Sequence, residues 1–178
     1  KLQKRTAFNL LGPLSNPAGV KNQLVGVFST EYLDRLPQIL KRKGAENIMT
    51  VRSDDGMDEF STSAINRVCF LKNGKVLMNA IDPEIIGLHK STLKDIQIQT
   101  KQDAIESFVN VLGGTANQAM IETTALNAAG GLIISNIVNN FEEGVEKALN
   151  TIKDGKAISL LEKFVKDTGD ISKLKEMI

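Results

Sequence analysis

Short apolar runs and one amphipathic stretch follow one another in the first third of the chain. Asn22–Phe28 and Asn47–Arg52 are apolar runs of strand length, and the stretch between them has helical periodicity. This helix is predicted to be capped by Thr30, to run to about Arg42 and to stop at Gly44. A strand, a helix and a second strand in this order predict a parallel crossover unit.

The next apolar runs predict an antiparallel hairpin. Arg67–Leu71 and Lys75–Asn79 flank Asn73-Gly74, the preferred centre of a type I′ turn, in which both central residues need positive φ. Two other segments are predicted to lack regular structure. Leu10–Pro17 contains two prolines, which fix φ and lack an N–H, so a rigid loop is expected there rather than a helix. Ile81–Leu88 is expected to be irregular.

The second half of the chain has the pattern of a series of helices. Thr100 followed by Asp103 imitates a capping box, and Asn140 followed by Glu143 marks another helix start, with Gly155 as its end. The expected helices are Ala104–Leu112, Ala116–Ser135, the segment from Asn140 to Gly155, and Ala157–Lys166. The whole pattern predicts a single α/β domain over residues 1–178, with a parallel crossover unit, an antiparallel hairpin and a helical C-terminal half.

Composition fits this picture and narrows the classes of partner. A chain of 178 residues, 42% of them apolar, can bury one sizeable core. Its 22 basic and 21 acidic residues give a net charge of +1, which provides no electrostatic case for a nucleic acid or a membrane as partner. Cys69 is the only cysteine and lies in an apolar run, so we expect a buried structural thiol in a cytoplasmic protein.

Candidate chemistry is concentrated in the acidic segment Ser53–Phe60. Four carboxylates, Asp54, Asp55, Asp58 and Glu59, surround a glycine directly after a predicted strand. Hard oxygen ligands of this kind suit Mg²⁺, which is commonly held by one or two carboxylates together with substrate phosphates. On an extended backbone Asp58 and Glu59 would point to opposite sides and could face different partners. A solvated acidic turn explains the same residues, because Asp and Gly favour turns for backbone reasons.

Other reactive residues are sparse. His89 is the only histidine, and a solvated loop residue is the expected role, since a catalytic triad or a zinc site needs further partners that the chain lacks. The basic run Lys41–Lys43 lies at a predicted helix end, where cations interact favourably with the helix dipole. Gly113–Thr115 follows a predicted helix and not a strand, which is the wrong context for a phosphate-binding loop.

Four segments, taken in order, carry a family resemblance. They are Arg5–Ala18, with its Leu-Gly-Pro-Leu-Ser-Asn-Pro core, then Gly56-Met57-Asp58-Glu59, then Pro83–Leu88, and finally Gly113-Gly114 followed by Leu126-Asn127-Ala128-Ala129. Together they resemble the signature of the anthranilate phosphoribosyltransferases. The resemblance implies a partial nucleoside phosphorylase/phosphoribosyltransferase-type α/β domain. It also implies transfer of the 5-phosphoribosyl group of phosphoribosyl pyrophosphate to the amino group of anthranilate, in tryptophan biosynthesis.

The resemblance also assigns roles to individual residues. Asp58 and Glu59 match the family's metal-binding pair and would hold Mg²⁺, the expected cofactor, against the pyrophosphate. Gly12 and Pro13 match a loop that borders the aromatic substrate. Arg5 is carried over as a further substrate-binding residue, although it matches a family position six residues after the arginine associated with the anthranilate carboxylate. The enzyme is expected to be a homodimer.

The resemblance covers only part of the family pattern. Family members are roughly twice as long and carry a helical N-terminal domain and a Gly-Thr-Gly-Gly-Asp phosphate loop, neither of which is in this chain. We therefore expect residues 1–178 to be the C-terminal part of a longer enzyme, the parent, and to be inactive alone. Two alternatives stay open at this point: a pyrimidine nucleoside phosphorylase-like enzyme and a non-catalytic binding relative on the same scaffold.

Overall fold

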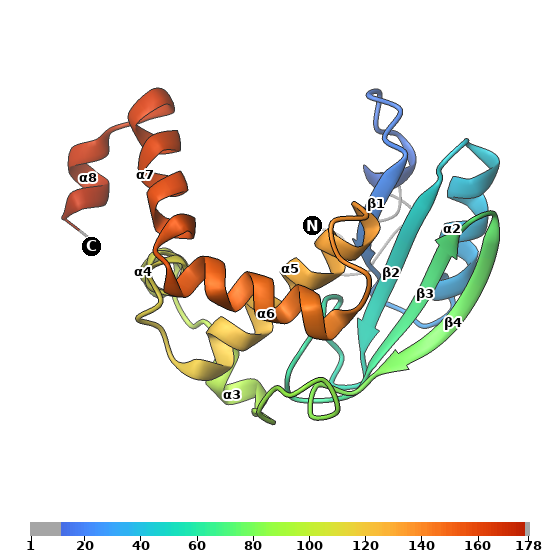
Figure 1. Cartoon of the computed structure of the whole chain (residues 1–178), viewed down its shortest axis with the longest axis horizontal. Helices are drawn as coiled ribbons and strands as arrows, with labels where there is room; N and C mark the ends of the chain where they lie inside the picture. The colour runs from blue at the N-terminus through green and yellow to red at the C-terminus, as the bar shows by residue number, and fades with distance from the viewer. Residues whose placement is uncertain (1–11, 177–178) are drawn as a thin grey trace, which may run out of the picture.

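The computed structural model describes residues 12–176 as one sheet with helices on both of its faces (Figure 1). The ribbon follows a U in which α7 and α8 form one arm, the sheet and α2 form the other, and α5 and α6 join them. The strands are β1 (Asn22–Gly26), β2 (Asn47–Ser53), β3 (Asn66–Lys72) and β4 (Lys75–Ile81), and the helices are α2 (Tyr32–Arg42), α3 (Leu93–Ile96), α4 (Lys101–Gly113), α5 (Gln118–Ile134), α6 (Phe141–Lys153), α7 (Lys156–Thr168) and α8 (Ile171–Lys175).

The sheet has the order β1-β2-β3-β4, so neighbouring strands in space are also neighbours in sequence. β1 and β2 are parallel, with Asn22 opposite Asn47, and α2 makes the crossover between them. β2 with β3 and β3 with β4 are antiparallel. The predicted parallel crossover unit and the predicted hairpin are both confirmed.

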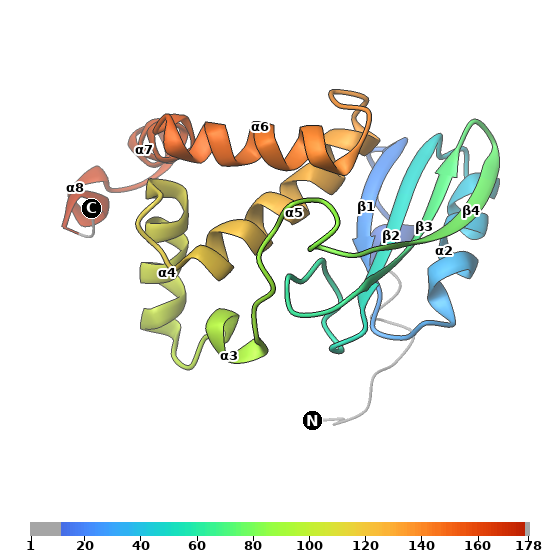
Figure 2. The same cartoon turned by 60° about the horizontal axis from the view of Figure 1, so that its bottom comes forward.

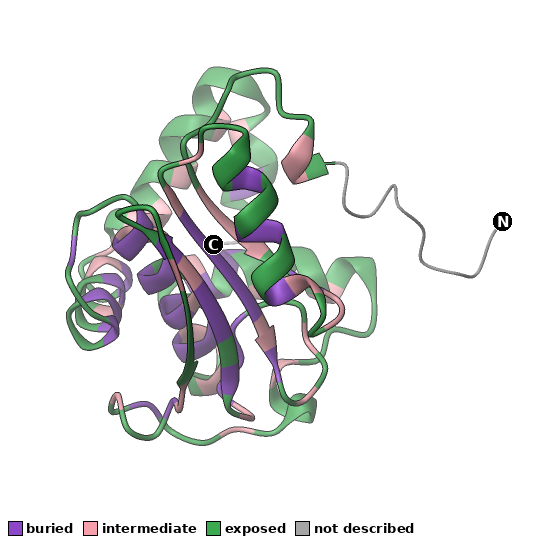
Figure 3. Ribbon diagram, turned by 90° about the vertical axis from the view of Figure 1, so that its right-hand side faces the viewer, coloured by how far each residue is buried: buried purple, intermediate pink, exposed green. Residues whose placement is uncertain are grey.

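Alternation along the strands divides the core into two layers (Figure 3). In β2, Ile48 belongs to the layer against α2 and Met49 to the layer against α5 and α6, because successive side chains of a strand point to opposite faces. The α2 layer is formed by Val27, Leu33, Leu36, Leu40, Ile48, Cys69 and Leu71. The other layer includes Met49, Val51, Phe60, Val68, Leu126, Ala129, Ile133 and Phe141. The predicted buried thiol is confirmed, since Cys69 is free and fully buried.

The β3–β4 turn has the geometry that its sequence predicts. Asn73 has φ 52° and Gly74 has φ 71°, so both central residues lie in the positive-φ region required by a type I′ turn. The turn is also tied to α2, because Lys41 Nζ donates a hydrogen bond to the carbonyl oxygen of Gly74 at 2.6 Å.

Replacing Gly74 with Val is expected to destabilise the protein by about 1–3 kcal/mol, because a β-branched residue resists positive φ. Asn73→Gly is the matched control, since glycine adopts positive φ without strain. Thermal melts of both variants test this prediction. A Gly74→Val variant that melts with the wild type would show that the turn is open or of another type.

The predicted helix starts are confirmed where a polar side chain caps the backbone. Thr100 Oγ1 accepts a hydrogen bond from the N–H of Asp103 at 3.0 Å, and the Asp103 carboxylate accepts one from the N–H of Thr100. Asn140 Oδ1 likewise accepts from the N–H of Glu143 at 2.8 Å. Gly114 ends α4 in the left-handed conformation, so the Gly-Gly-Thr segment is a helix end, as its context predicts.

Two predictions near the N-terminus are wrong in detail. Residues 12–14 are helical, whereas a loop was expected over Leu10–Pro17. A proline is tolerated in the first turn of a helix, where its missing N–H has no partner to lose, and this explains the error at Pro13. The capping residue of α2 is Glu31, without a side-chain hydrogen bond, in place of Thr30. Across residues 12–176, no helix is both long and apolar enough to cross a membrane.

Candidate active site

The acidic segment lies where β2 ends, at the edge of the sheet formed by the carboxyl ends of β1 and β2 (Figure 2). Its backbone turns back on itself: the N–H of Ser53 donates to the carbonyl of Met57 at 2.9 Å, and the N–H of Gly56 donates to the carbonyl of Ser53 at 3.1 Å. Gly56 has φ +103°, a conformation that side chains resist. The extended backbone assumed from the sequence is therefore wrong for this segment, which is a turn followed by a bend.

Two of its four carboxylates are engaged within the protein. Asp54 pairs with Arg67 through three contacts of 2.9–3.2 Å from Nε and Nη2. Asp55 accepts hydrogen bonds from the N–H of Met57, at 2.9 Å, and from the hydroxyl of Ser63. Burial would raise the pKa of Asp55, but hydrogen bonding by Ser61, Ser63, the Met57 N–H and Ser53 outweighs it, and the pKa is lowered. Asp54 and Asp55 thus shape the turn, which accounts for half of the acidic cluster.

Asp58 and Glu59 are exposed, and over residues 12–176 no hydrogen bond or ion pair engages either carboxylate. Partial desolvation of its carboxylate, followed by the negative charges of Asp58 and Asp55, raises the pKa of Glu59 above its ordinary value. A bound cation would relieve this repulsion. The described residues hold no cluster of three or more acidic, histidine or cysteine ligands. A pair of carboxylates fits Mg²⁺ that takes its other ligands from water and phosphate.

Gly26, the last residue of β1, sets the position of this pair. A Cβ atom at Gly26 would lie 1.5 Å from the carbonyl oxygen of Asp58 and 2.7 Å from its carbonyl carbon. The backbone of the acidic segment therefore rests directly on β1 at a point where only glycine leaves room. β1 and β2 both contribute to the site, β2 by leading into the segment and β1 by supporting it.

Two asparagine side chains bind the backbone immediately after Glu59. Asn127, from α5, accepts from the N–H of Phe60 at 3.1 Å and donates to its carbonyl at 2.8 Å. Asn66, at the start of β3, accepts from the N–H of Ser61 at 2.8 Å and donates to its carbonyl at 2.9 Å. The Leu-Asn-Ala-Ala segment of α5 therefore contacts the acidic segment through Asn127.

A cavity of about 280 Å³ opens beside the acidic segment. Its walls are mainly apolar and come from the segment itself, the connection between α3 and α4, and helices α4 and α5. Among the lining residues are Met57, Glu59, Ile98, Phe108, Met120 and Thr123. A cation held at Glu59 would lie at the border of this hollow, which offers room for an uncharged part of a ligand.

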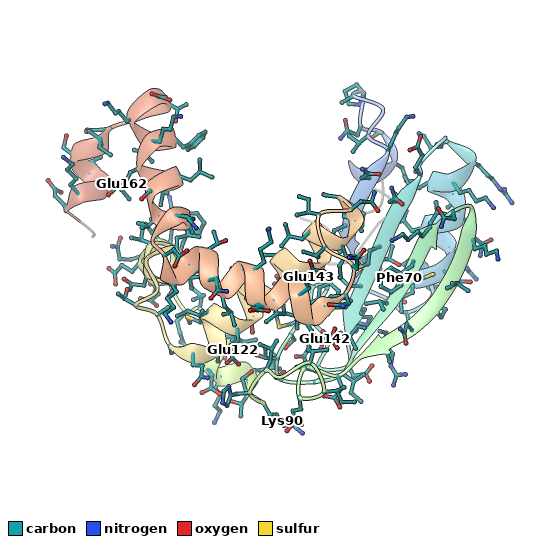
Figure 4. All side chains as sticks on the ribbon, in the orientation of Figure 1. Phe70, Lys90, Glu122, Glu142, Glu143 and Glu162 are labelled. Atoms are coloured by element: carbon teal, nitrogen blue, oxygen red, sulfur yellow. The ribbon has the colours of Figure 1, made fainter. Side chains whose placement is uncertain are left out.

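His89 has a partner that the sequence does not show. Its side chain is 73% exposed, as expected for a loop residue, but Nδ1 lies 2.8 Å from Oε1 of Glu122, and the backbone N–H of His89 donates to Oε2 of Glu122 at 2.8 Å. Glu122 is buried on α5, and Figure 4 shows it on that helix, with Lys90 on the connecting segment nearby. This contact ties the Pro83–Leu88 region to α5.

The other predicted substrate residues do not meet the acidic segment. Lys43 Nζ, at the end of α2, donates to the carbonyl of Leu14, which places residues 12–14 beside the amino ends of β1 and β2. Gly12 and Pro13 therefore lie at the amino ends of β1 and β2, whereas Asp58 lies at the carboxyl ends of these strands. Arg5 lies outside the described residues.

Sequence reasoning missed the supporting residues Gly26, Asn66 and Asn127. One signal was available: asparagine is unfavourable in helix interiors, so Asn127 within the apolar and small-residue stretch Ala125–Ile134 points to a specific partner. Gly26 had no such signal, because a glycine at a strand end is common and the approach of Asp58 depends on the folded loop.

The chain matches one protein family and is similar in sequence to several curated proteins. Residues 1–158 match the glycosyl transferase family, a/b domain. The chain is 84% identical over 177 residues to an anthranilate phosphoribosyltransferase of Nitrosopumilus maritimus, covering 99% of this chain and 51% of that protein. It is 48% identical over 176 residues to the one of Cenarchaeum symbiosum, with the same coverage. The chain thus spans about half the length of these curated relatives.

Solved structures agree on the fold. The anthranilate phosphoribosyltransferase of Thermus thermophilus has a TM-score of 0.83 at 33% identity, over 93% of this chain and 48% of that one. The enzyme of Saccharomyces cerevisiae in complex with PRPP (phosphoribosyl pyrophosphate) and Mg has a TM-score of 0.77 at 26% identity, over 96% of this chain and 48% of that one.

Proposed function

Because the chain belongs to the glycosyl transferase family, a/b domain, we propose that it is the C-terminal part of an anthranilate phosphoribosyltransferase. The parent would transfer the 5-phosphoribosyl group of phosphoribosyl pyrophosphate to the amino group of anthranilate. The observation that carries this proposal is the pair Asp58 and Glu59, exposed and without a partner among the described residues, on a segment that glycine and asparagine residues hold in place.

Asp58 and Glu59 are proposed to hold Mg²⁺ together with the pyrophosphate of the substrate. The fit rests on the donor set: two oxygen ligands supply too few bonds for an octahedral ion, which then takes up water and phosphate oxygens. When bound, Mg²⁺ would supply positive charge against the pyrophosphate as its bond to C1 of the ribose weakens. Support for this cofactor comes from the structure of the Saccharomyces cerevisiae enzyme in complex with PRPP and Mg.

The other side chains fit a reaction that depends on positioning and leaving-group stabilisation. The only histidine, His89, faces Glu122 and lies outside the acidic segment. No observation favours the nucleoside phosphorylase or the non-catalytic alternative. The substrate-binding roles of Arg5, Gly12 and Pro13, the homodimer and the cytoplasmic location stay predictions. For Gly12 and Pro13, the distance from the acidic segment along β1 gives no support to a shared substrate site.

The isolated chain is expected to form no phosphoribosylanthranilate, because the family's phosphate loop would lie in the other half of the parent. It should nevertheless fold, since both core layers lie within residues 12–176. Turnover of anthranilate and phosphoribosyl pyrophosphate by the parent, by the isolated chain, and by the chain with the preceding half added in trans tests this. An inactive parent would refute the proposed function. An isolated chain as active as the parent would refute only the expectation that the chain needs the other half of the parent.

The isolated chain is also expected to self-associate. Among residues 12–176, β1 is an edge strand, and α7 exposes Leu160 (68%) and Phe164 (61%), so unpaired backbone groups and apolar side chains of this part of the chain are both available to another chain. Light scattering at increasing concentration, with and without the preceding half, measures this. A chain that stays monomeric at high concentration would contradict it.

A further inference from the structure

Two asparagine side chains bind the backbone of two consecutive residues, Phe60 and Ser61, directly after the carboxylate pair. Asn127 bonds both the N–H and the C=O of Phe60, and Asn66 bonds both groups of Ser61. A primary amide presents a donor and an acceptor side by side, as a peptide group does, so each asparagine replaces a neighbouring strand for one residue. A strand partner would bring a whole row of hydrogen bonds, whereas each asparagine makes two bonds to a single residue.

These hydrogen bonds are buried, and the asparagine that bonds Phe60 is itself held in place. Phe60, Ser61 and Asn66 are fully buried, which shields these hydrogen bonds from competition by water. Asn127 is itself fixed, because its Nδ2 also donates to the carbonyl of Thr123, one turn earlier in α5, at 2.9 Å. The peptide of Phe60 therefore has a fixed position relative to the helix.

The Phe60 ring anchors the same residue to α5. It lies in the core layer between sheet and helix, with its centroid 5.2 Å from that of Phe141, in an edge-on arrangement. A Cβ atom at Gly130 would lie 2.8 Å from Phe60 Cε2, so the helix approaches the ring as closely as a glycine allows. Backbone and side chain of Phe60 are thus both held by α5, and Glu59 is the residue directly before it.

We propose that Asn127 is a positioning residue for the carboxylates of Asp58 and Glu59. By fixing the peptide of Phe60 against α5, it keeps Glu59 oriented for a cation that the segment alone would hold poorly. Gly26 supports the backbone of Asp58, so the pair is held by contacts to both β1 and α5. The proposal rests on the proposed function, since it assigns Asn127 to the metal site of that reaction.

The test uses the parent with Asn127→Ala and Asn127→Asp. The alanine variant loses all three hydrogen bonds. The aspartate variant keeps an acceptor for the N–H of Phe60 and loses both donated bonds. Asn117→Ala is the matched control, because Asn117 caps the same helix through the N–H of Met120 and donates to Asp95, without contact to the acidic segment.

The measurement is the Mg²⁺ concentration for half-maximal turnover, together with calorimetric binding of Mg²⁺ in the presence of phosphoribosyl pyrophosphate. Asn127→Ala is expected to weaken Mg²⁺ binding about 10- to 100-fold, the range for residues that orient metal ligands. Asn127→Asp should shift the Mg²⁺ requirement in the same direction, because its second carboxylate oxygen would face the carbonyls of Phe60 and Thr123 that Nδ2 bonds in the wild type. Asn117→Ala should lower the melting temperature and leave the Mg²⁺ requirement unchanged, because a capping residue acts on stability alone.

An Asn127→Ala variant that is less stable but has the wild-type Mg²⁺ requirement would overturn the proposal. If that variant does not fold, an unchanged requirement in Asn127→Asp overturns it equally. A wild-type parent that binds Mg²⁺ with phosphoribosyl pyrophosphate, forms no product and loses this binding on Asn127→Ala would support the positioning role while refuting the reaction.

Discussion

Replacing Asp58 with Asn and Glu59 with Gln in the parent is expected to reduce turnover at limiting Mg²⁺ by about 10²-fold or more, because metal ions supply several kcal/mol of charge stabilisation. Both substitutions keep the size of the side chain and remove its charge. Asp58 and Glu59 have no partner among the described residues that the loss of charge would disturb. The free energy of unfolding should therefore change little.

Calorimetry separates this effect from a general loss of binding. In the wild type, phosphoribosyl pyrophosphate should tighten Mg²⁺ binding, and in the double variant this gain should disappear. Asp54→Asn is the matched control, since it removes a charge from the same segment but one that pairs with Arg67. Wild-type turnover by the double variant at limiting Mg²⁺ would show that the ion is held elsewhere.

Gly26→Ala is expected to produce the second large effect. The new Cβ atom would overlap the carbonyl oxygen of Asp58, 1.5 Å away, and the obstacle is backbone that cannot rotate aside. The acidic segment has to move off β1, which costs about 1–3 kcal/mol or more of stability, as overpacking does. Asp58 moves with it, so the parent should also lose Mg²⁺-dependent turnover.

Gly131→Ala is the control for Gly26→Ala, because a Cβ atom at Gly131 in α5 meets no described atom within 4 Å. In a helix interior this change should be neutral or stabilising by about 0.5–1 kcal/mol. Thermal melts and turnover of both variants decide the matter. Turnover at the wild-type level in Gly26→Ala would mean that the segment does not rest on β1 in the active enzyme.

The parts of the fold that could be predicted from the sequence are those fixed by local chemistry. The crossover unit follows from two apolar runs around an amphipathic helix, and the hairpin from Asn73-Gly74. Pro13 shows the limit of such rules, because a proline both breaks helices and begins them, and its neighbours did not decide between the two.

The candidate site could be predicted only in part, because its supporting contacts are not local in the sequence. Asp58 and Glu59 were identified by residue type and family resemblance, but the contacts that hold them join residues far apart in the chain. Asn127 and Phe60 are 67 positions apart. Nothing in the local sequence around Phe60 indicates an amide partner on α5. The placement of Gly12 and Asp58 near opposite ends of β1 also depends on the folded sheet.

The burial of Cys69 between α2 and the sheet gives this protein a built-in reporter of unfolding. The residue lies on β3 opposite Thr50 of β2 and Met78 of β4, and it is the only cysteine in the chain. Burial, followed by the charge of Asp34, raises the pKa of its thiol to about 11. Since the thiolate is the species that reacts with alkylating reagents and α2 covers the Cys69 side chain, Cys69 is labelled when α2 leaves the sheet or the chain unfolds. Labelling rates can therefore rank the glycine and asparagine variants by the free energy of the unfolding that exposes Cys69.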